Sequence, residues 1–145
     1  MYAVRPPAVA GSFYPADKIT LARTVHTLLD EADGATPGET SPVKALIAPH
    51  AGYIYSGSTA ALAYHRLAMR RARIRRVVLL GPTHRVAISG LALPDADAFA
   101  TPLGEVAVDP AAAGDLAGLP DVVVNREAHQ WEHSLEVHLP FLQTV

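Results

Sequence analysis

The stretch Val77-Val78-Leu79-Leu80-Gly81-Pro82-Thr83-His84 is an apolar run that breaks at glycine and proline and ends at a histidine. Leu46-Ile47-Ala48-Pro49-His50 has the same arrangement earlier in the chain. Short, nearly continuous apolar runs are typical of strands that are covered on both faces in a parallel sheet. We therefore predict an α/β fold with buried strands at 43–48 and 76–80, each followed by a histidine.

A helix is predicted between these two strands. Ser58 follows a glycine-rich turn and is expected to cap a helix that runs to about Arg71. In such a β-α-β unit the connection is right-handed and the strands are parallel, so both strand ends lie at one edge of the sheet. Ligands bind at this edge in open α/β sheets. We therefore expect His50 and His84 to face one crevice.

Two histidines at one crevice are candidate metal ligands, because neutral imidazole commonly binds iron, zinc or copper. Taken singly, a loop histidine is more often a surface or hydrogen-bonded residue, and it is the pairing of His50 with His84 that favours a metal. The chain has no cysteine, so disulfides are excluded and only imidazole, carboxylate and water remain as ligands. Asp95 and Asp109 are possible carboxylate ligands, but Asp109 precedes a proline and is predicted to cap the following turn.

The remaining elements are predicted from apolar spacing and from breaker residues. Residues 5–15 contain too many breakers for a helix and are expected to form an extended arm with turns. Apolar residues at helical spacing after Asp17, a suitable N-cap, predict an amphipathic helix at 18–32, followed by a linker loop at 34–42. Strands are expected at 87–93, within 99–109 around a turn, and at 122–124, and helices at 110–116 and 132–142.

Length and composition indicate one globular domain over residues 1–145. The chain is 50% hydrophobic and 18% charged with a formal net charge of −2, which argues against disorder and against a nucleic-acid or membrane partner. Six arginines between Arg66 and Arg76 are interpreted as a solvated helix end rather than a nucleic-acid patch. No apolar run approaches the roughly 20 residues that span a bilayer, and no signal-peptide core is present, so a cytoplasmic location is expected.

Residues 49–57, Pro-His-Ala-Gly-Tyr-Ile-Tyr-Ser-Gly, surround one histidine with small side chains. Glycine lets the backbone approach a ligand closely and turn sharply into the next helix. The tyrosines and the serine are able to hydrogen-bond a ligand in the cleft. A phosphate or nucleotide ligand is an alternative, although the segment matches neither a Walker loop nor a dinucleotide fingerprint. The candidate substrate-binding residues are Gly52, Tyr53, Tyr55 and Ser56.

The same segment resembles the signature of the Memo family, named for a mediator of ErbB-driven cell motility and widespread in prokaryotes. Further resembling segments occur in the same order along almost the whole chain. They are Arg5 with Pro7-Ala8-Val9-Ala10-Gly11-Ser12-Phe13-Tyr14-Pro15, Leu80-Gly81-Pro82-Thr83-His84, Thr101-Pro102-Leu103-Gly104 with Asp109, and Glu132-His133-Ser134-Leu135-Glu136 with Leu139-Pro140-Phe141-Leu142. The resemblance implies a three-layer α/β fold akin to class III extradiol dioxygenases of the protocatechuate type, with a mostly parallel or mixed central sheet flanked by helices.

The resemblance also implies a metal site. Positions that match His50 and His84 are metal-site positions in that superfamily, and Fe(II) is the favoured ion, with zinc or copper as alternatives. The third position, a cysteine in Memo proteins and a glutamate in the dioxygenases, comes from a C-terminal half that this chain lacks, as does the later Ser-Asp-Phe/Leu-x-His element. We therefore expect a truncated domain, inactive by itself, whose exposed hydrophobic edge makes it a homo-oligomer or is completed by another chain.

His133 belongs to one of the resembling segments and is assigned a role beside the metal or in contact with substrate. The alternative is a capping contact at the start of a helix. Because His133 and Glu136 are three residues apart, we expect them on one helix face, as a metal pair or an acid/base couple. The remaining histidines that were considered are predicted to be structural or exposed, and they are His26, His65, His129 and His138.

Two functions remain open on this evidence. The first is a metal-dependent oxidoreductase related to extradiol dioxygenases that acts on a small aromatic or otherwise oxidisable molecule. The second is a non-catalytic module that holds a metal or binds a peptide or protein, as the roles of Memo proteins in signalling and metal handling suggest. Prokaryotic Memo-like proteins are also often named component B of the AmmeMemoRadiSam system, together with a radical-SAM protein and an AMMECR-type partner.

Overall fold

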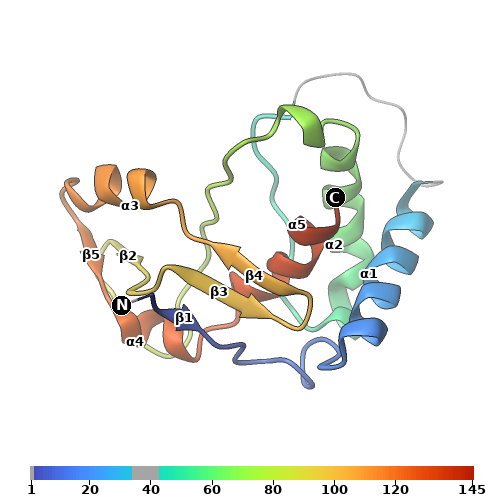
Figure 1. The fold of residues 1–145 in the computed structure, drawn as a ribbon, viewed down its shortest axis with the longest axis horizontal. Helices are drawn as coiled ribbons and strands as arrows, with labels where there is room; N and C mark the ends of the chain where they lie inside the picture. The colour runs from blue at the N-terminus through green and yellow to red at the C-terminus, as the bar shows by residue number, and fades with distance from the viewer. Residues whose placement is uncertain (1, 34–42) are drawn as a thin grey trace.

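The computed structural model describes residues 2–33 and 43–145 and is an α/β fold with a mixed sheet flanked by helices (Figure 1). In the larger sheet, β1 (Val4–Arg5) is parallel to β3 (Ala98–Thr101), and β3 is antiparallel to β4 (Gly104–Ala107). A second sheet pairs β2 (Leu91–Leu93) in parallel with β5 (Val122–Val124).

The linker predicted at 34–42 lies outside the described residues. Within them the helices are α1 (Lys18–Asp33), α2 (Tyr53–Ala68), α3 (Pro110–Ala117), α4 (Arg126–Gln130) and α5 (Leu139–Thr144), with the 3-10 turns η1 (Arg71–Arg73) and η2 (Glu136–His138).

The core lies where α1, α2 and α5 pack together (Figure 1). The prediction of α1 is confirmed, and Asp17 caps it by accepting the Thr20 N–H at 2.8 Å. Fully burying one large apolar side chain contributes about 1.5–3 kcal/mol, so this contact supplies much of the stability. The buried apolar side chains that form it include Leu21, Val25, Leu29, Ala60, Ala61, Tyr64 and Phe141.

The start of α2 differs from the prediction, since the helix begins at Tyr53 and not at Ser58. Its first N–H, on Tyr53, donates to the carbonyl of Phe13 at 2.7 Å. Gly57, which we placed in a turn, lies inside the helix, where a Cβ would come 3.0 Å from Cδ1 of Leu28. This glycine therefore serves the close approach of α2 to α1 and not a change of chain direction.

The prediction of buried strands at 43–48 and 76–80 is wrong. Neither segment is paired in a sheet among the described residues. Ile47 is fully exposed, and Val78 and Leu80 are 68% and 75% exposed. A strand needs a neighbour that pairs its N–H and C=O groups, and an apolar run does not specify that neighbour. Residues 74–79 instead line a cavity of about 490 Å³ together with β4, α3 and α5.

The prediction of a single helix at 132–142 is also wrong. A short helix that we did not predict, α4, comes first, and its N-cap Asn125 accepts the Ala128 N–H at 3.0 Å. Residues 132–133 are irregular, and residues 134–135 form a turn that leads into η2 and α5. Glu132 accepts backbone N–H groups within this segment, and such local side-chain bonds compete with helical ones.

Glu136 of η2 anchors the N-terminal arm. Its side chain is fully buried, and the carboxylate accepts the N–H groups of Ala8 and Val9 at 2.8 and 3.0 Å and the hydroxyl of Tyr14 at 2.5 Å. The guanidinium of Arg5 forms an ion pair with the same carboxylate. A buried charge is tolerated only when such partners compensate its lost hydration. The arm and the segment 132–138 are therefore joined by a buried polar network.

Other local predictions are confirmed in the region from β3 to β5. β3 and β4 surround a turn, and Gly104, the first residue of β4, has a φ of 135°, a conformation that favours glycine. Asp109 caps α3 by accepting the N–H groups of Ala111 and Ala112, each at 3.0 Å. β5 occupies the predicted residues. Across the described ranges, the helices are too short or too polar to cross a membrane.

Candidate metal centre

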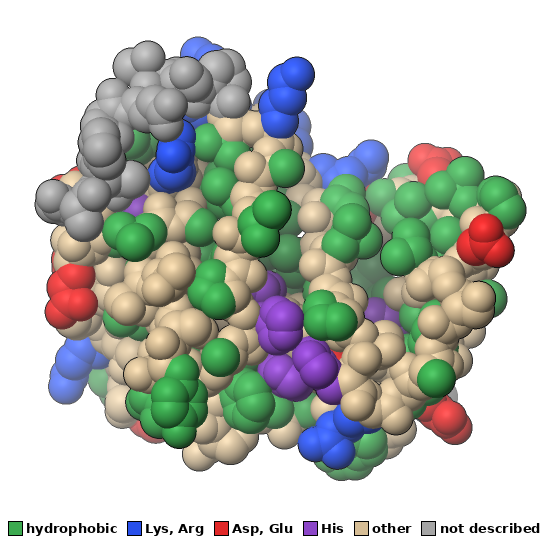
Figure 2. Space-filling view, turned by 180° about the vertical axis from the view of Figure 1, so that it is seen from behind, with side chains coloured by type: hydrophobic (Ala, Val, Ile, Leu, Met, Phe, Trp, Pro, Cys, Tyr) green, Lys and Arg blue, Asp and Glu red, His purple; other side chains and the backbone are tan. Residues whose placement is uncertain are grey.

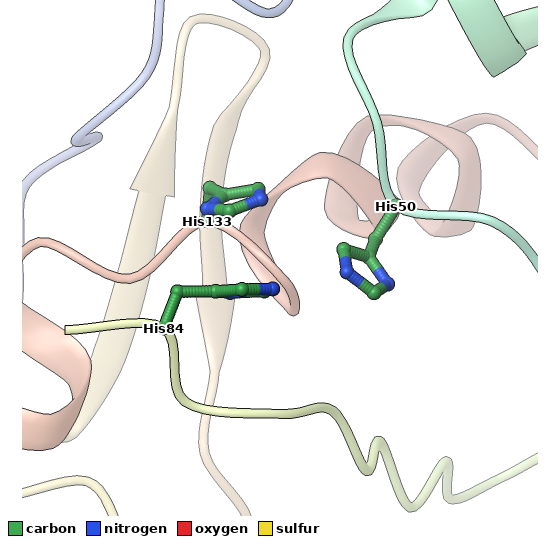
Figure 3. Close-up of side chains that lie close together, drawn as sticks. All are labelled: His50, His84 and His133. Atoms are coloured by element: carbon green, nitrogen blue, oxygen red, sulfur yellow. The ribbon is translucent and has the colours of Figure 1, made fainter. Parts of the chain in front are cut away.

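Three histidines from three separate loops meet at the surface. His50 precedes α2, His84 follows the segment 76–80, and His133 lies between α4 and η2. Ring centroids are 5.3 Å apart for His50 and His84, 5.7 Å for His50 and His133, and 4.6 Å for His84 and His133. Figure 3 shows the rings of His84 and His133 one above the other, with His50 beside them. Figure 2 shows histidine side chains gathered in the middle of one face.

The structure brings His50 and His84 together without the paired parallel strands that we expected to do so. The loop that carries His84 packs tightly on residues 132–134. A Cβ on Gly81 would come 2.9 Å from Oγ of Ser134, so a larger residue would push the two loops apart. The same Oγ donates to the carbonyl of Pro82 at 2.8 Å. Close loop packing, and not a β ladder, therefore sets the position of His84.

Glu132 is the charged group of the cluster. It is 6% exposed, and its Oε1 lies 2.9 Å from Nδ1 of His84 and 3.2 Å from Nδ1 of His133. Backbone N–H groups of His84, His133 and Ser134 donate to the carboxylate at 2.6, 2.8 and 2.9 Å. Burial by itself would raise the pKa of Glu132, but these hydrogen bonds outweigh it and lower the pKa to about 2. Burial lowers the pKa of His133, which favours its neutral form.

The cluster opens into a cleft of about 570 Å³. Of the predicted substrate-binding residues, Gly52 and Tyr55 line this cleft, together with Ser12 and Phe13. A Cβ on Gly52 would lie 3.4 Å from the backbone of Phe13, so the glycine permits the close approach of the two loops. The cleft is therefore lined by the imidazoles of His50 and His133 and by largely apolar side chains.

Two of the predicted substrate-binding residues have other partners. Tyr53 is buried, its hydroxyl donates to the carbonyl of Val137 at 2.8 Å, and its ring packs 5.0 Å from that of Phe141. The hydroxyl of Ser56 donates to the carbonyl of Ala51 at 3.3 Å. The structure thus gives Tyr53 a place in the core and ties Ser56 to the turn before α2.

His133 is itself a member of the histidine cluster, whereas the sequence predicted a role beside the metal or in contact with substrate. It does not begin a helix, and it does not share a face with Glu136, which is directed into the arm network. Its ring instead stacks on His84 at an interplanar angle of 24°. We also did not foresee the contact of Glu132 with two imidazoles. The only signal in the sequence was the adjacent pair Glu132-His133 within a segment of the family resemblance.

The other four histidines, which we predicted to be structural or exposed, are not members of the cluster. His26 is exposed on α1, and His65 on α2 lies 3.1 Å from Asp33. Nε2 of His129 is 2.9 Å from a backbone carbonyl. His138 is buried, and this burial lowers its pKa to about 4.

The donor set fits a transition metal. One ligand nitrogen from each of His50, His84 and His133 lies within 4.8 Å of the other two. Metal–nitrogen bonds of about 2.0–2.1 Å place two nitrogens on one ion no more than about 4.2 Å apart, so small side-chain rotations suffice. Imidazole suits iron, copper or zinc better than calcium or magnesium. Asp95 and Asp109 do not join the cluster, because they contact Arg126 and Arg76.

The fold and the cluster define an α/β protein whose three histidines are arranged compatibly with metal binding. The family model described as Memo-like protein matches residues 5–145. The chain therefore belongs to the Memo-like family, which confirms the resemblance seen in its sequence motifs.

Curated relatives carry the same family name. A MEMO1 family protein of Aquifex aeolicus (strain VF5) is 44% identical over 140 residues, covering 97% of this chain and 49% of the relative. A MEMO1 family protein of Ignicoccus hospitalis is 44% identical over 149 residues, covering 97% and 51%. One from Thermococcus kodakarensis is 40% identical over 144 residues, covering 97% and 47%. The chain thus spans about half the length of the curated relatives it matches.

Proposed function

We propose that this chain supplies a three-histidine metal site in a Memo-like protein, with His50, His84 and His133 as ligands. The observation that carries the proposal is the meeting of three imidazoles from three different loops, two of which, His50 and His133, line one cleft. Fe(II) is the favoured ion, in line with the dioxygenase resemblance, and zinc and copper are the alternatives, since neutral imidazole suits all three.

When bound, such an ion supplies Lewis-acid or redox chemistry at its open coordination positions. The role of the chain's own residues is to bind the ion and to orient a ligand in the cleft. The cleft accommodates a small molecule or a peptide side chain, with Phe13 and Tyr55 forming part of its wall. Glu132 keeps a negative charge behind two of the imidazoles, which offsets the charge of a cation.

The leading function is a metal-dependent oxidoreductase, akin to the extradiol dioxygenases, that acts on a small oxidisable molecule. Family membership and the presence of His50 and His84 in one cluster support it. The alternative is a non-catalytic metal-binding or peptide-binding module, such as a component of a radical-SAM-associated system. One observation favours this alternative, because the third cluster member is an imidazole, whereas open iron sites of oxygenases typically combine two histidines with a carboxylate.

Metal analysis of the purified chain tests the site. We expect about one equivalent of iron, copper or zinc per chain in the wild type, and its loss in His50→Ala, His84→Ala and His133→Ala. His26→Ala is the matched control, because this exposed histidine of α1 lies outside the cluster. Equal metal in all five proteins would contradict the proposal. Metal that is lost in His50→Ala and His84→Ala but retained in His133→Ala would reduce the site to two histidines.

Oxygen uptake with catechols separates the two functions. It is measured on this chain and on the longer Aquifex aeolicus relative, each loaded with Fe(II). Uptake that depends on His50 and His84 supports the oxidoreductase. Stoichiometric metal without uptake in either protein supports the binding module.

A further inference from the structure

Glu132 makes its two histidine contacts through a single oxygen atom. Oε1 lies 2.9 Å from Nδ1 of His84 and 3.2 Å from Nδ1 of His133. The backbone N–H groups of His133 and Ser134 hold this oxygen in place at 2.8 and 2.9 Å, and Oε2 accepts the N–H of His84 at 2.6 Å. With 6% of its surface exposed, the carboxylate has little freedom to move.

The hydrogen bond to His84 determines where the proton of that imidazole lies. An ionised carboxylate is only an acceptor, so the Nδ1 atom of His84 that is hydrogen-bonded to it has to carry the hydrogen. In a neutral imidazole the other nitrogen, Nε2, then has a free lone pair. Without such a partner, the proton of the ring is free to occupy Nε2 and to block that lone pair.

We propose that Glu132 is a positioning residue which holds His84 in the Nδ1–H form through their hydrogen bond and so presents the Nε2 atom of His84 to the ion. This inference deepens the proposed metal site and rests on it. The ring of His133 stacks on that of His84, as Figure 3 shows. Partners of this kind on metal-binding histidines set the tautomer and ring orientation, and their loss typically weakens metal affinity about 10–100-fold.

Glu136, only four residues further on, shows that a buried carboxylate in this segment need not act on the histidines. Its acceptors are filled by Arg5, Tyr14 and two backbone N–H groups. Glu132, in contrast, has two imidazole nitrogens among its neighbours. A purely structural role would be satisfied by backbone donors and would leave the imidazole tautomers unaffected.

The first test uses the metal-free wild-type chain labelled with 15N-histidine. Nuclear magnetic resonance distinguishes protonated from unprotonated ring nitrogens, and resonances are assigned with His84→Gln and His133→Gln. We expect His84 in the Nδ1–H form at a pH at which its ring is neutral. An Nε2–H form for His84 would overturn the proposal. Because no metal is present, this result does not depend on whether the proposed metal site is correct.

The second test measures zinc affinity by competition with a chromophoric chelator. Glu132→Gln removes the charge and offers one acceptor atom instead of two, so we expect affinity to fall about 10–100-fold. Glu127→Gln, an exposed change on α4, is the matched control and should leave affinity unchanged. Unchanged affinity in a folded Glu132→Gln protein would overturn the proposal. If Glu132→Gln does not fold, the proposal is tested by the tautomer of His84 in the wild type instead.

The two proposals fail differently. An Nδ1–H tautomer of His84 in a wild type that binds no zinc, iron or copper would leave the placement of the proton intact and refute the metal site. Stoichiometric metal with Nε2–H at His84 would leave the metal site intact and refute the role of Glu132.

Discussion

The helical side of the molecule and its extended segments use apolar residues in opposite ways. α1, α2 and α5 bury theirs against one another, whereas the segments 43–48 and 76–80 leave many of theirs in contact with solvent. The extended segments are richer in apolar residues than α1, yet they form no β ladder among the described residues and are much more exposed. An apolar run therefore contributes to a core only where another element meets it. The segment 132–138 serves both regions, since Glu136 anchors the packed arm and Glu132 contacts the histidines.

The largest effect is expected on the packed side, from Glu136→Ala. This change leaves the guanidinium of Arg5 and the hydroxyl of Tyr14 without their buried acceptor. Breaking a buried ion pair on one side typically costs about 3–5 kcal/mol. Urea unfolding monitored by circular dichroism measures the loss, with the exposed change Glu127→Ala as control. A loss below about 1 kcal/mol would show that the arm is not anchored in this way.

A pair of leucine truncations tests the contrast directly. Leu21→Ala removes a fully buried side chain from α1, which should cost about 2–5 kcal/mol of unfolding free energy. Leu80→Ala removes a side chain that is 75% exposed, and the change should stay within about 0.5 kcal/mol. Equal losses, measured by urea unfolding, would mean that the extended segment is packed in solution.

Lowering the pH should decrease the free energy of unfolding, because Glu132 beside the histidines becomes protonated. Its pKa is lowered in the folded chain to about 2 from an ordinary value of 4.5. The carboxylate therefore stabilises the fold fully above about pH 4.5, and this contribution is lost as the pH falls toward 2. The difference in unfolding free energy between wild type and Glu132→Gln should shrink over the same range. A difference that stays constant from pH 6 to pH 3 would be inconsistent with this pKa.

The smallest effect on the fold, but a clear one on association, is expected from Val78→Ser combined with Leu80→Ser. Exposed apolar side chains on an unpaired segment favour pairing with another chain. We therefore propose that the wild type is a dimer or larger, and light scattering should show the variant shifted toward the monomer. Surface changes of this kind alter stability by about 0.5 kcal/mol or less per site. A monodisperse wild-type monomer at micromolar concentration would contradict the proposed association.

The sequence by itself determined the features that depend on neighbours within a few residues. The apolar spacing after Asp17 predicted α1, the pattern of 99–109 predicted strands around a turn, and Asp109 before a proline predicted the cap of α3. Each of these rests on backbone hydrogen bonds and side-chain contacts within one segment. The motifs also identified the family, and they named His50 and His84 as a pair.

Tertiary structure decided what depends on segments far apart in the chain. Gly57 lies within a helix because α1 passes close to it, and the helix predicted at 132–142 is broken where its carboxylates find partners elsewhere. The same long-range contacts bring His133 onto His84 and place Glu132 behind both rings. Local propensities amount to tenths of a kcal/mol per residue, whereas leaving one buried charge without a partner costs several. For this reason the buried contacts of Glu132 and Glu136, and not the helical spacing of their segment, set the shape of the site.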